Sequence, residues 1–216
     1  MANGKIGRIR IMSSRKKGDH FTRKAKASGF EARSVFKLEE INKRFKVFRK
    51  NQNVLDLGCA PGSWTRYASQ QIGLGGLCVG IDRSPVNLSM PNVRCLEGDI
   101  YEIDASTFSK HADHFDLVMS DMAPDTCGNR FTDHVRSVQL CERALEIALM
   151  YLRPRGHFIC KIFEGPDTSE FFATVKSHFK NVKRVKPKST RSESVEFFIV
   201  GIERLGSPPP AADAVP

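Results

Sequence analysis

Short hydrophobic runs alternate with amphipathic stretches through the middle of the chain. The runs read VLDLG, LCVGID, VRCLEGD, FDLVMSD and HFICKIF, and each has the length of a buried strand. Between them lie stretches whose apolar residues recur at helical spacing, such as SWTRYASQQ and HVRSVQLCERALEIALMYL. Strands that alternate with helices predict a parallel sheet with helices on both of its faces.

Further elements are expected on either side of this pattern. Ahead of it, an amphipathic helix that carries Lys37 is predicted by apolar residues at helical spacing: Val35, Phe36, Leu38, Ile41 and Phe45. After it, we expect a basic helix, a short strand around residues 182–185 and a last strand with the sequence SVEFFIV. The prediction is an α/β fold, a Rossmann-like and mostly parallel sheet of seven strands.

The two ends of the chain differ from its middle in composition. The chain has 216 residues, enough for one well-packed domain, which we place at residues 21–204. Residues 1–20 are polar and basic and predict a flexible arm, and residues 205–216 are rich in Pro and Ala and predict a disordered tail. The N-terminus lacks the apolar core of a secretory signal, and no stretch reaches the roughly 18 apolar residues of a membrane span. We therefore expect a cytoplasmic monomer that does not enter a membrane.

Positive charge is concentrated at the start of the chain. Residues 1–50 carry 16 Lys and Arg against 4 Asp and Glu, whereas residues 51–216 carry 18 against 20. A second basic stretch contains no acidic residue: Lys176, Lys180, Lys183, Arg184, Lys186, Lys188 and Arg191. Such a charge run is most often a solubilising surface, but a net charge of +10 gathered in this way favours a polyanion partner, and RNA or DNA is the first candidate.

The six cysteines are scattered and lie mostly inside apolar runs: Cys59, Cys78, Cys95, Cys127, Cys141 and Cys160. They form no CxxC pair, and no clustered histidines complete a zinc site. The aspartates are not spaced like a cage for a cation either. We interpret the cysteines as reduced core residues and expect no metal.

A turn with two glycines follows the first strand, in the sequence NVLDLGCAPGSWTRYA. Gly58 and Gly62 permit a close approach of the backbone to a ligand, Pro61 fixes the turn, and Ser63 can cap the next helix. An ordinary strand-to-helix turn is the alternative, because glycine-rich loops match loosely.

Two acidic residues strengthen the case for a cofactor site. Asp82 ends the second strand, where a carboxylate can accept hydrogen bonds from both ribose hydroxyls of an adenosine, and Asp99 ends the third, where it can accept from an adenine amino group. Because ligands bind at the carboxyl ends of parallel strands, Gly58, Asp82 and Asp99 are expected in one crevice. The turn lacks the G-x-G-x-x-G pattern of a dinucleotide site, which argues against NAD and favours S-adenosylmethionine.

Lys161 lies in the middle of the fifth strand, where an unpaired ammonium group would be costly to bury. The fourth strand ends in Asp121, which can pair with Lys161 if the two strands are neighbours in the sheet. The pair can be catalytic, or it can be a buried structural ion pair.

Five segments make the chain resemble the FtsJ-type ribosomal RNA 2′-O-ribose methyltransferases: ARSVFKLEEI, VLDLGCAPGSW, VMSDMAP, FICKIFEG and SVEFFIVG. They stand in the order of the family, and the likeness extends from about residue 19 to residue 204. It implies a class I S-adenosylmethionine-dependent methyltransferase. Its substrate would be the 2′-hydroxyl of a uridine ribose in large-subunit (23S-type) ribosomal RNA.

The resemblance also assigns roles to residues. The catalytic set of the family falls on Lys37, Asp121, Lys161 and Glu196, and its cofactor contacts fall on Gly62, Trp64, Asp82, Asp99 and Asp121. Cys59 and Ser63 depart from the commonest family loop but are small enough to fit. Trp64, the only tryptophan, can equally well pack the first helix without touching a cofactor.

The expected reaction leaves alternatives open. Lys161 is the expected base for the ribose hydroxyl, but it can instead remain charged and orient that hydroxyl while solvent takes the proton. Alternative functions are a transfer RNA 2′-O-methyltransferase and a cofactor-binding RNA module without catalysis. An adenine N-methyltransferase is disfavoured because DMAP is not an Asn/Asp-Pro-Pro-aromatic loop.

Overall fold

The computed structural model of the protein describes residues 20–206, apart from residues 105 and 192. The predicted basic arm therefore lies outside the described residues except for its last residue, as does the predicted tail from residue 207 onward. The domain boundaries at residues 21 and 204 stay a prediction. No helix in the part of the chain that is described is long and apolar enough to cross a membrane.

A mixed sheet of seven strands forms the centre of the molecule, in the order β3-β2-β1-β4-β5-β7-β6. Strands β1 to β5 are mutually parallel, and β7 is antiparallel to both β5 and β6. The strand bounds are β1 Asn53–Leu57, β2 Leu77–Asp82, β3 Val93–Glu97, β4 Phe115–Ser120, β5 Leu152–Phe163, β6 Phe179–Val185 and β7 Glu196–Arg204. The order reverses between β1 and β4, so a crevice opens where the carboxyl ends of these strands diverge.

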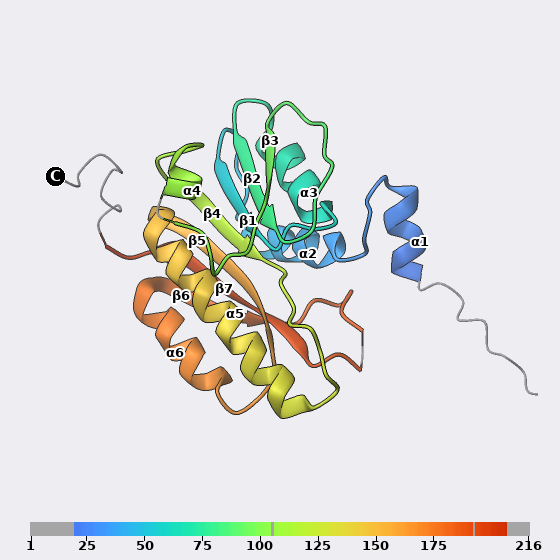
Figure 1. Ribbon diagram of the computed structural model, residues 1–216, viewed down its shortest axis with the longest axis vertical. Helices are drawn as coiled ribbons and strands as arrows, with labels where there is room; N and C mark the ends of the chain where they lie inside the picture. Colours follow the sequence, from blue (N-terminus) through green and yellow to red (C-terminus); the bar gives the residue numbers. More distant parts are fainter. Residues whose placement is uncertain (1–19, 105, 192, 207–216) are drawn as a thin grey trace, which may run out of the picture.

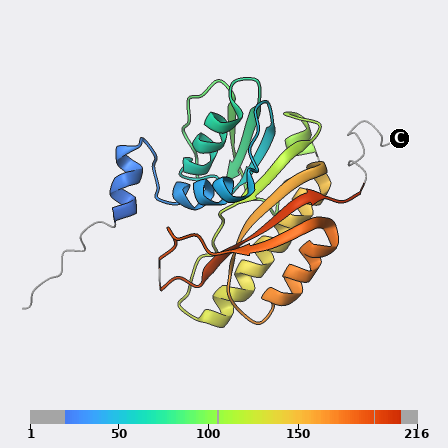
Figure 2. The ribbon, with the colours of Figure 1, turned by 180° about the vertical axis from the view of Figure 1, so that it is seen from behind.

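Helices cover both faces of the sheet (Figures 1 and 2). The layer of α4, α5 and α6 lies on one face, and α2 and α3 lie on the other, with α1 at the outer side of α2. Their bounds are α1 His20–Ala27, α2 Val35–Phe45, α3 Ser63–Ile72, α4 Ser106–Ser109, α5 Arg130–Tyr151 and α6 Thr168–His178. The predicted α/β fold with helices on both faces is confirmed.

Each face of the sheet has its own hydrophobic core. Alternating residues of the strands enter opposite cores, so that on β5 Phe158 packs toward α5 while its neighbour Ile159 packs toward α2 and α3. Both side chains are fully buried. The parallel strands are therefore apolar on both sides, which explains why they read as continuous hydrophobic runs in the sequence.

Some elements differ from the expectation. Strand β5 begins at Leu152 rather than His157, because the intervening RPRG, which reads as a turn, forms an irregular extension of the strand. Helices α1 and α4 were not predicted, and the second has only four residues, too few to show a period. The predicted cap by Ser63 is wrong: Gly62 occupies the cap position and Ser63 Oγ accepts a hydrogen bond from Ala32 N at 2.7 Å.

Candidate active site

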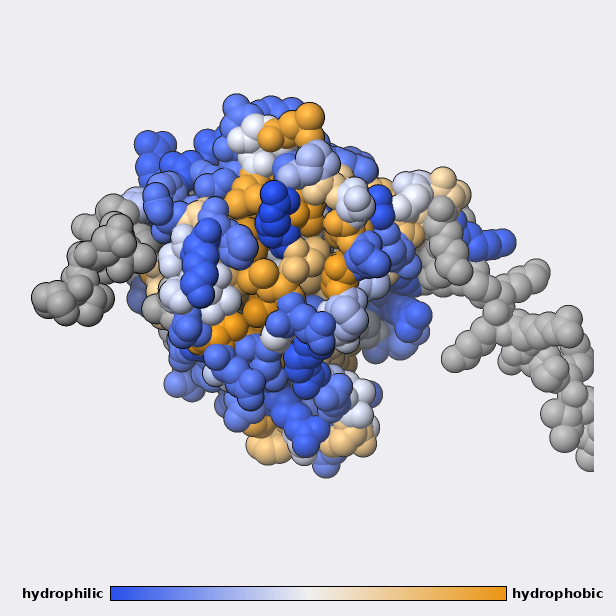
Figure 3. Space-filling model, turned by 45° about the horizontal axis from the view of Figure 1, so that its top comes forward, coloured by the Kyte–Doolittle hydropathy of each residue, from blue (hydrophilic) through white to orange (hydrophobic). Residues whose placement is uncertain are grey.

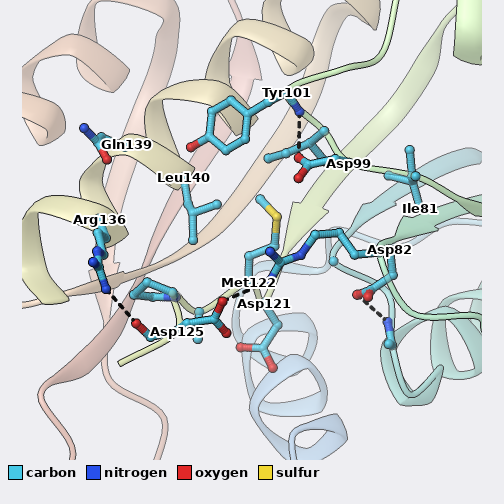
Figure 4. A pocket seen from close by; sticks show the side chains of 17 residues that line it. Ile81, Asp82, Asp99, Tyr101, Asp121, Met122, Asp125, Arg136, Gln139 and Leu140 are labelled. Carbon is cyan, nitrogen blue, oxygen red and sulfur yellow. Dashed lines mark hydrogen bonds and ion pairs between the residues drawn. The ribbon is translucent and has the colours of Figure 1, made fainter. Parts of the chain in front are cut away.

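A cavity of about 350 Å³ lies at the carboxyl ends of β1, β2, β3 and β4 (Figure 4). It is lined by the first glycine of the turn, Gly58, and by three carboxylates that each stand at or just after a strand end: Asp82, Asp99 and Asp121. The structure thus brings together residues from four separate segments. The order of the strands brings Gly58, Asp82 and Asp99 into one crevice, as predicted.

Gly58 and Gly62 both adopt backbone conformations that favour glycine, with φ of +76° and +108°. A β-carbon on Gly58 would collide with the side chain of Met122 inside the cavity. A β-carbon on Gly62 would lie 2.9 Å from a methyl group of Leu88, outside the cavity lining. Gly58 therefore keeps space open at the cavity, whereas Gly62 allows the turn to pack on the loop after β2.

Hydrogen bonds to the backbone fix the two carboxylates after β2 and β3. Asp82 accepts from the backbone N–H of Ala60 at 3.0 Å and from that of Ser84 at 2.8 Å, so it ties the glycine turn to its own strand. Asp99 Oδ1 accepts from the backbone N–H of Tyr101 at 3.0 Å. Both carboxylates are held rigidly and retain further lone pairs that can accept hydrogen bonds from a ligand.

The lining of the cavity is partly apolar. Eight of its residues are hydrophobic or proline: Ala60, Ile81, Ile100, Tyr101, Met122, Ala123, Pro124 and Leu140. Hydrophobic residues also gather in the middle of the face that carries α4 and α5, surrounded by hydrophilic ones (Figure 3). An apolar wall with a few fixed carboxylates is the usual composition of a small-molecule site.

Lys161 and Asp121 form a buried pair at the edge of this cavity. Strands β4 and β5 are neighbours, with Ser120 in register with Cys160, so the next residues of the two strands meet. Lys161 is only 7% exposed, and its Nζ lies 3.0 Å from Oδ1 of Asp121 while it donates a hydrogen bond to the backbone oxygen of the same residue. The contact to Oδ1 is an ion pair without hydrogen-bond geometry, because this buried atom accepts no hydrogen bond from the described residues.

A second buried ion pair, between Lys37 of α2 and Glu196 of β7, lies beside the first. Phe198 connects the two pairs, since it is in register with Lys161 on β5 and its ring centre lies 5.9 Å from Nζ of Lys37. Both lysines of the predicted catalytic set therefore lie beside one aromatic side chain, and each is paired with its carboxylate. Two ammonium groups and two carboxylates balance in charge, which makes the burial of each lysine tolerable.

Trp64 lies behind the predicted catalytic set rather than in the cavity. Its ring stacks on Phe198 at 5.7 Å between ring centres, and its indole N–H donates to the backbone oxygen of Ser34 at 3.0 Å. The side chain is 3% exposed and is absent from the cavity lining. This geometry favours the packing role; contact with a cofactor stays a prediction.

Sequence reasoning missed several residues of the cavity wall. From α5 come Arg136, Gln139 and Leu140, which share one face of the helix. Arg83 reaches to Asp125 at 3.5 Å, and Arg136 donates to the backbone oxygen of Asp125 at 3.0 Å, so the two arginines border the mouth of the cavity. The helical period of α5 was visible in the sequence, but nothing there indicated which face meets the cavity. Met122 could have been found from its position next to Asp121.

Four of the predicted core cysteines are buried, but Cys127 is exposed and Cys95 is half-buried. Cys127 lies six residues after Asp121 in a loop that closes onto α5, where its backbone N–H donates to Asp133 at 2.8 Å. The prediction of a core position for Cys127 is therefore wrong. Both the backbone and the thiol of Cys127 contact Asp133, so the loop is anchored on α5 while the residue itself stays at the surface.

Asp56 is a carboxyl group buried beneath the glycine turn. It is fully buried in β1, accepts a hydrogen bond from Thr65 Oγ1 at 2.6 Å through Oδ2, and has no partner among the described residues for Oδ1. Burial raises the pKa of Asp56 to about 7, and the nearby carboxylate of Asp121 adds to the increase. The folded protein is therefore most stable when Asp56 is protonated.

The wild-type protein is expected to lose stability as the pH rises, and Asp56→Asn is expected to prevent that loss. An unfolded Asp ionises near pH 4, whereas folded Asp56 ionises near pH 7, so its contribution to stability is full below pH 4 and is lost progressively up to pH 7. Asparagine can still accept from Thr65 and has no charge to bury. We expect the variant to be more stable than the wild type by about 2–4 kcal/mol at pH 8, with little difference near pH 4.

Urea unfolding at several pH values measures this effect. Asp113→Asn, at an exposed carboxyl group, is the matched control and should follow the wild type at every pH. Parallel pH curves for the wild type and Asp56→Asn would show that Asp56 is ionised in the folded protein, contrary to the expectation.

Comparison with known proteins agrees with this geometry. A family model described as FtsJ-like methyltransferase matches residues 30–204. A protein of Desulfatibacillum aliphaticivorans named ribosomal RNA large subunit methyltransferase E is 46% identical over 201 residues, which cover 90% of this chain and 97% of that protein. A protein of the same name from Bdellovibrio bacteriovorus is 47% identical over 189 residues, 86% of this chain and 96% of the relative.

A solved structure shares the fold. The crystal structure of a ribosomal RNA methyltransferase from Plasmodium falciparum superimposes with a TM-score of 0.72 at 26% sequence identity, covering 82% of this chain and all of that one. Fold and site thus define the class of protein, a methyltransferase with a Rossmann-like seven-stranded sheet. Within that class, the chain belongs to the FtsJ-like methyltransferase family. The family, the fold class and the enzymatic class predicted from the sequence are confirmed.

Proposed function

We propose that the protein transfers a methyl group from S-adenosylmethionine to the 2′-hydroxyl of a ribose, expected to be a uridine, in large-subunit ribosomal RNA. The observation that carries the proposal is the buried Lys161–Asp121 pair at the cavity edge, next to the Lys37–Glu196 pair. Relatives whose names specify large-subunit ribosomal RNA cover nearly the whole chain at 46–47% identity and support the choice of substrate.

The cavity fits S-adenosylmethionine in size and chemistry. Its volume of about 350 Å³ falls in the range of small-molecule sites, and its apolar wall can contact an adenine ring. Asp82 would accept from the ribose hydroxyls and Asp99 from the adenine amino group. When bound, the cofactor supplies a methyl group on a positively charged sulfur, which suits a cavity lined by carboxylates.

Lys161 and Asp121 would act on the acceptor hydroxyl. Lys161 holds that oxygen in line with the methyl group and receives its proton as the new C–O bond forms and the C–S bond breaks. The lysine must be neutral at that moment, and Asp121 fixes the position of its amine. Oδ1 of Asp121 is buried and lies 3.0 Å from Nζ of Lys161, so this oxygen faces the amine that it positions.

The RNA strand would enter beside the second ion pair. A second cavity, of about 370 Å³, adjoins Lys37 and Glu196 and is lined by Arg33, Ser34, Arg191, Glu193 and Ser194. Arg33 donates to the backbone oxygen of Ser189, which connects the chain segment before α2 to the loop between β6 and β7. Arginines at this position suit the phosphates that flank the target ribose.

Methyl transfer to ribosomal RNA tests the proposal. The purified protein is incubated with labelled S-adenosylmethionine and large ribosomal subunits from cells that lack the gene, and the digested RNA is searched for labelled 2′-O-methyluridine. Subunits from cells that carry the gene are the matched control and should take up little label, because their site is already methylated. Label in transfer RNA instead, or in no RNA despite cofactor binding, would overturn the proposed substrate.

A further inference from the structure

A third cavity lies at the opposite edge of the sheet from the catalytic set, where the parallel strands begin. It has a volume of about 270 Å³ and is lined by Arg49, Arg153, Arg155 and Glu203. Arg49 precedes β1, the next two arginines lie near the start of β5, and Glu203 is near the end of the antiparallel β7. Arg155 is well separated from Lys161, since the regular part of β5 from His157 to Lys161 alone spans about 13 Å at about 3.3 Å per residue.

An irregularity of β5 presents two of these arginines. Phe115 and Leu117 of β4 are in register with Leu152 and His157 of β5, so β5 contains extra residues in this interval. Arg155 has a φ of +63°, and Glu203 has a φ of +58°. Positive φ is uncommon for residues other than glycine and tends to occur at functional positions, and two such residues line this one small cavity.

The cavity has an excess of positive charge. Arg153 pairs with Asp116, and Glu203 pairs with Lys180 at 3.0 Å. Among the described residues Arg49 and Arg155 form no salt bridge, and Arg155 has only a longer-range attraction to Glu203. Burial and the adjacent Arg49 lower the pKa of His157 to about 4, so this neighbouring side chain is uncharged at neutral pH. Two guanidinium groups that form no salt bridge can bind one phosphate through several parallel N–H donors.

Exposed cations connect this cavity to the catalytic side. Strand β6 is the edge strand of the sheet and runs parallel to β5, from Lys180 beside the arginine cavity toward the loop that carries Arg191. The exposed cations along this path are Lys180, Lys183, Arg184, Lys186, Lys188 and Arg191. No acidic residue interrupts them in the sequence, and although Lys180 pairs with Glu203 and Arg184 with Glu164, four further cations remain along this edge for a polyanion: Lys183, Lys186, Lys188 and Arg191.

We propose that the cavity of Arg49, Arg153, Arg155 and Glu203 is a second RNA contact, which binds a backbone phosphodiester of the substrate RNA away from the methylated ribose. The inference rests on the proposed function, because it takes the substrate to be RNA. A folded ribosomal RNA can present phosphates at both sites at once, and a contact with phosphate fixes the position of the protein without reading sequence.

The salt dependence of RNA binding tests this inference. The affinity of the full-length protein for the large-subunit RNA is measured at several salt concentrations for the wild type and for Arg49→Gln/Arg155→Gln. Each lost phosphate contact lowers the slope of log K against log salt by about 0.7–0.9, and the two arginines share one phosphate, so the double variant should bind about tenfold more weakly at low salt with a slope smaller by about 0.7–0.9. Arg49→Lys/Arg155→Lys should recover most of the slope, because it keeps both charges.

Arg94→Gln/Lys110→Gln removes the same charge from exposed positions outside the cavity and is the matched control. If it lowers the slope as much as the cavity variant does, net charge alone explains the effect and the inference fails.

Inorganic phosphate at constant ionic strength provides a second experiment. If phosphate raises the melting temperature of the wild type but not of the cavity variant, while both proteins bind RNA equally, the cavity is a free-phosphate site and the inference fails. Unfolding midpoints verify that each variant is folded. Failure of the proposed function would be seen separately, as RNA that the wild type binds but does not methylate.

Discussion

Lys161→Met is expected to lower the rate of methyl transfer by roughly a thousandfold, because the amine that positions the hydroxyl and accepts its proton is gone. Methionine keeps much of the aliphatic volume in the strand, so cofactor affinity should stay within about threefold. Single-turnover transfer to the ribosomal RNA and calorimetric titration with S-adenosylmethionine measure the two quantities. Lys50→Met, at an exposed lysine, is the matched control and should leave the rate unchanged.

A structural ion pair would respond differently from a catalytic one. Removing Lys161 leaves Asp121 as an uncompensated buried carboxylate, which costs about 3–5 kcal/mol of stability. Adding Asp121→Asn removes that charge and should restore much of the stability. If activity returns together with stability in the double variant, the pair is structural and the catalytic assignment of Lys161 is wrong; if activity remains lost in a stable protein, the assignment holds.

Asp82→Ala is expected to weaken the binding of S-adenosylmethionine by about 10- to 100-fold, which corresponds to the 1.5–3 kcal/mol of a hydrogen bond to a charged group. Two losses combine in this variant. The ribose hydroxyls lose their acceptor, and the backbone N–H of Ala60 loses the partner that holds the glycine turn. Isothermal titration calorimetry measures the dissociation constant.

Asp125→Asn is the matched control for Asp82→Ala. Asp125 also lines the cavity, but its carboxylate is exposed and only 3.5 Å from Arg83 at the mouth. We expect its affinity to stay within about threefold of the wild type, as is usual for an exposed ion pair. Equal affinities for Asp82→Ala and the wild type would exclude Asp82 as a cofactor contact.

The sequence predicts the site better than it predicts the walls around it. Gly58, Asp82, Asp99 and Asp121 stand at strand ends, and since parallel strands end at one edge of a sheet, their meeting follows once the strands are recognised. Lys161 in an apolar strand requires an anion, and the β4–β5 pairing supplies Asp121. These inferences need only the local hydrophobic pattern of each strand and the rule that parallel strands end at the same edge of a sheet.

Other features depend on packing between distant segments, which no local pattern contains. The face of α5 that meets the cavity is set by how the helix crosses the sheet, so Gln139 and Leu140 could not be assigned from their spacing. The RPRG segment reads as a turn because of its Pro and Gly, yet it belongs to β5 and carries Arg155 into a cavity. The position of Trp64 on Phe198 likewise joins residues more than a hundred positions apart.

The stacked pair of Trp64 and Phe198 also provides an intrinsic fluorescence probe. Since the chain has one tryptophan, all of its indole emission arises from a ring that lies against Phe198, between the helix after the glycine turn and the strand opposite Lys161. The ring is shielded from water in the folded state. A red shift of the emission spectrum therefore reports the separation of α3 from β7, so the loss of this particular contact can be followed without attaching any label.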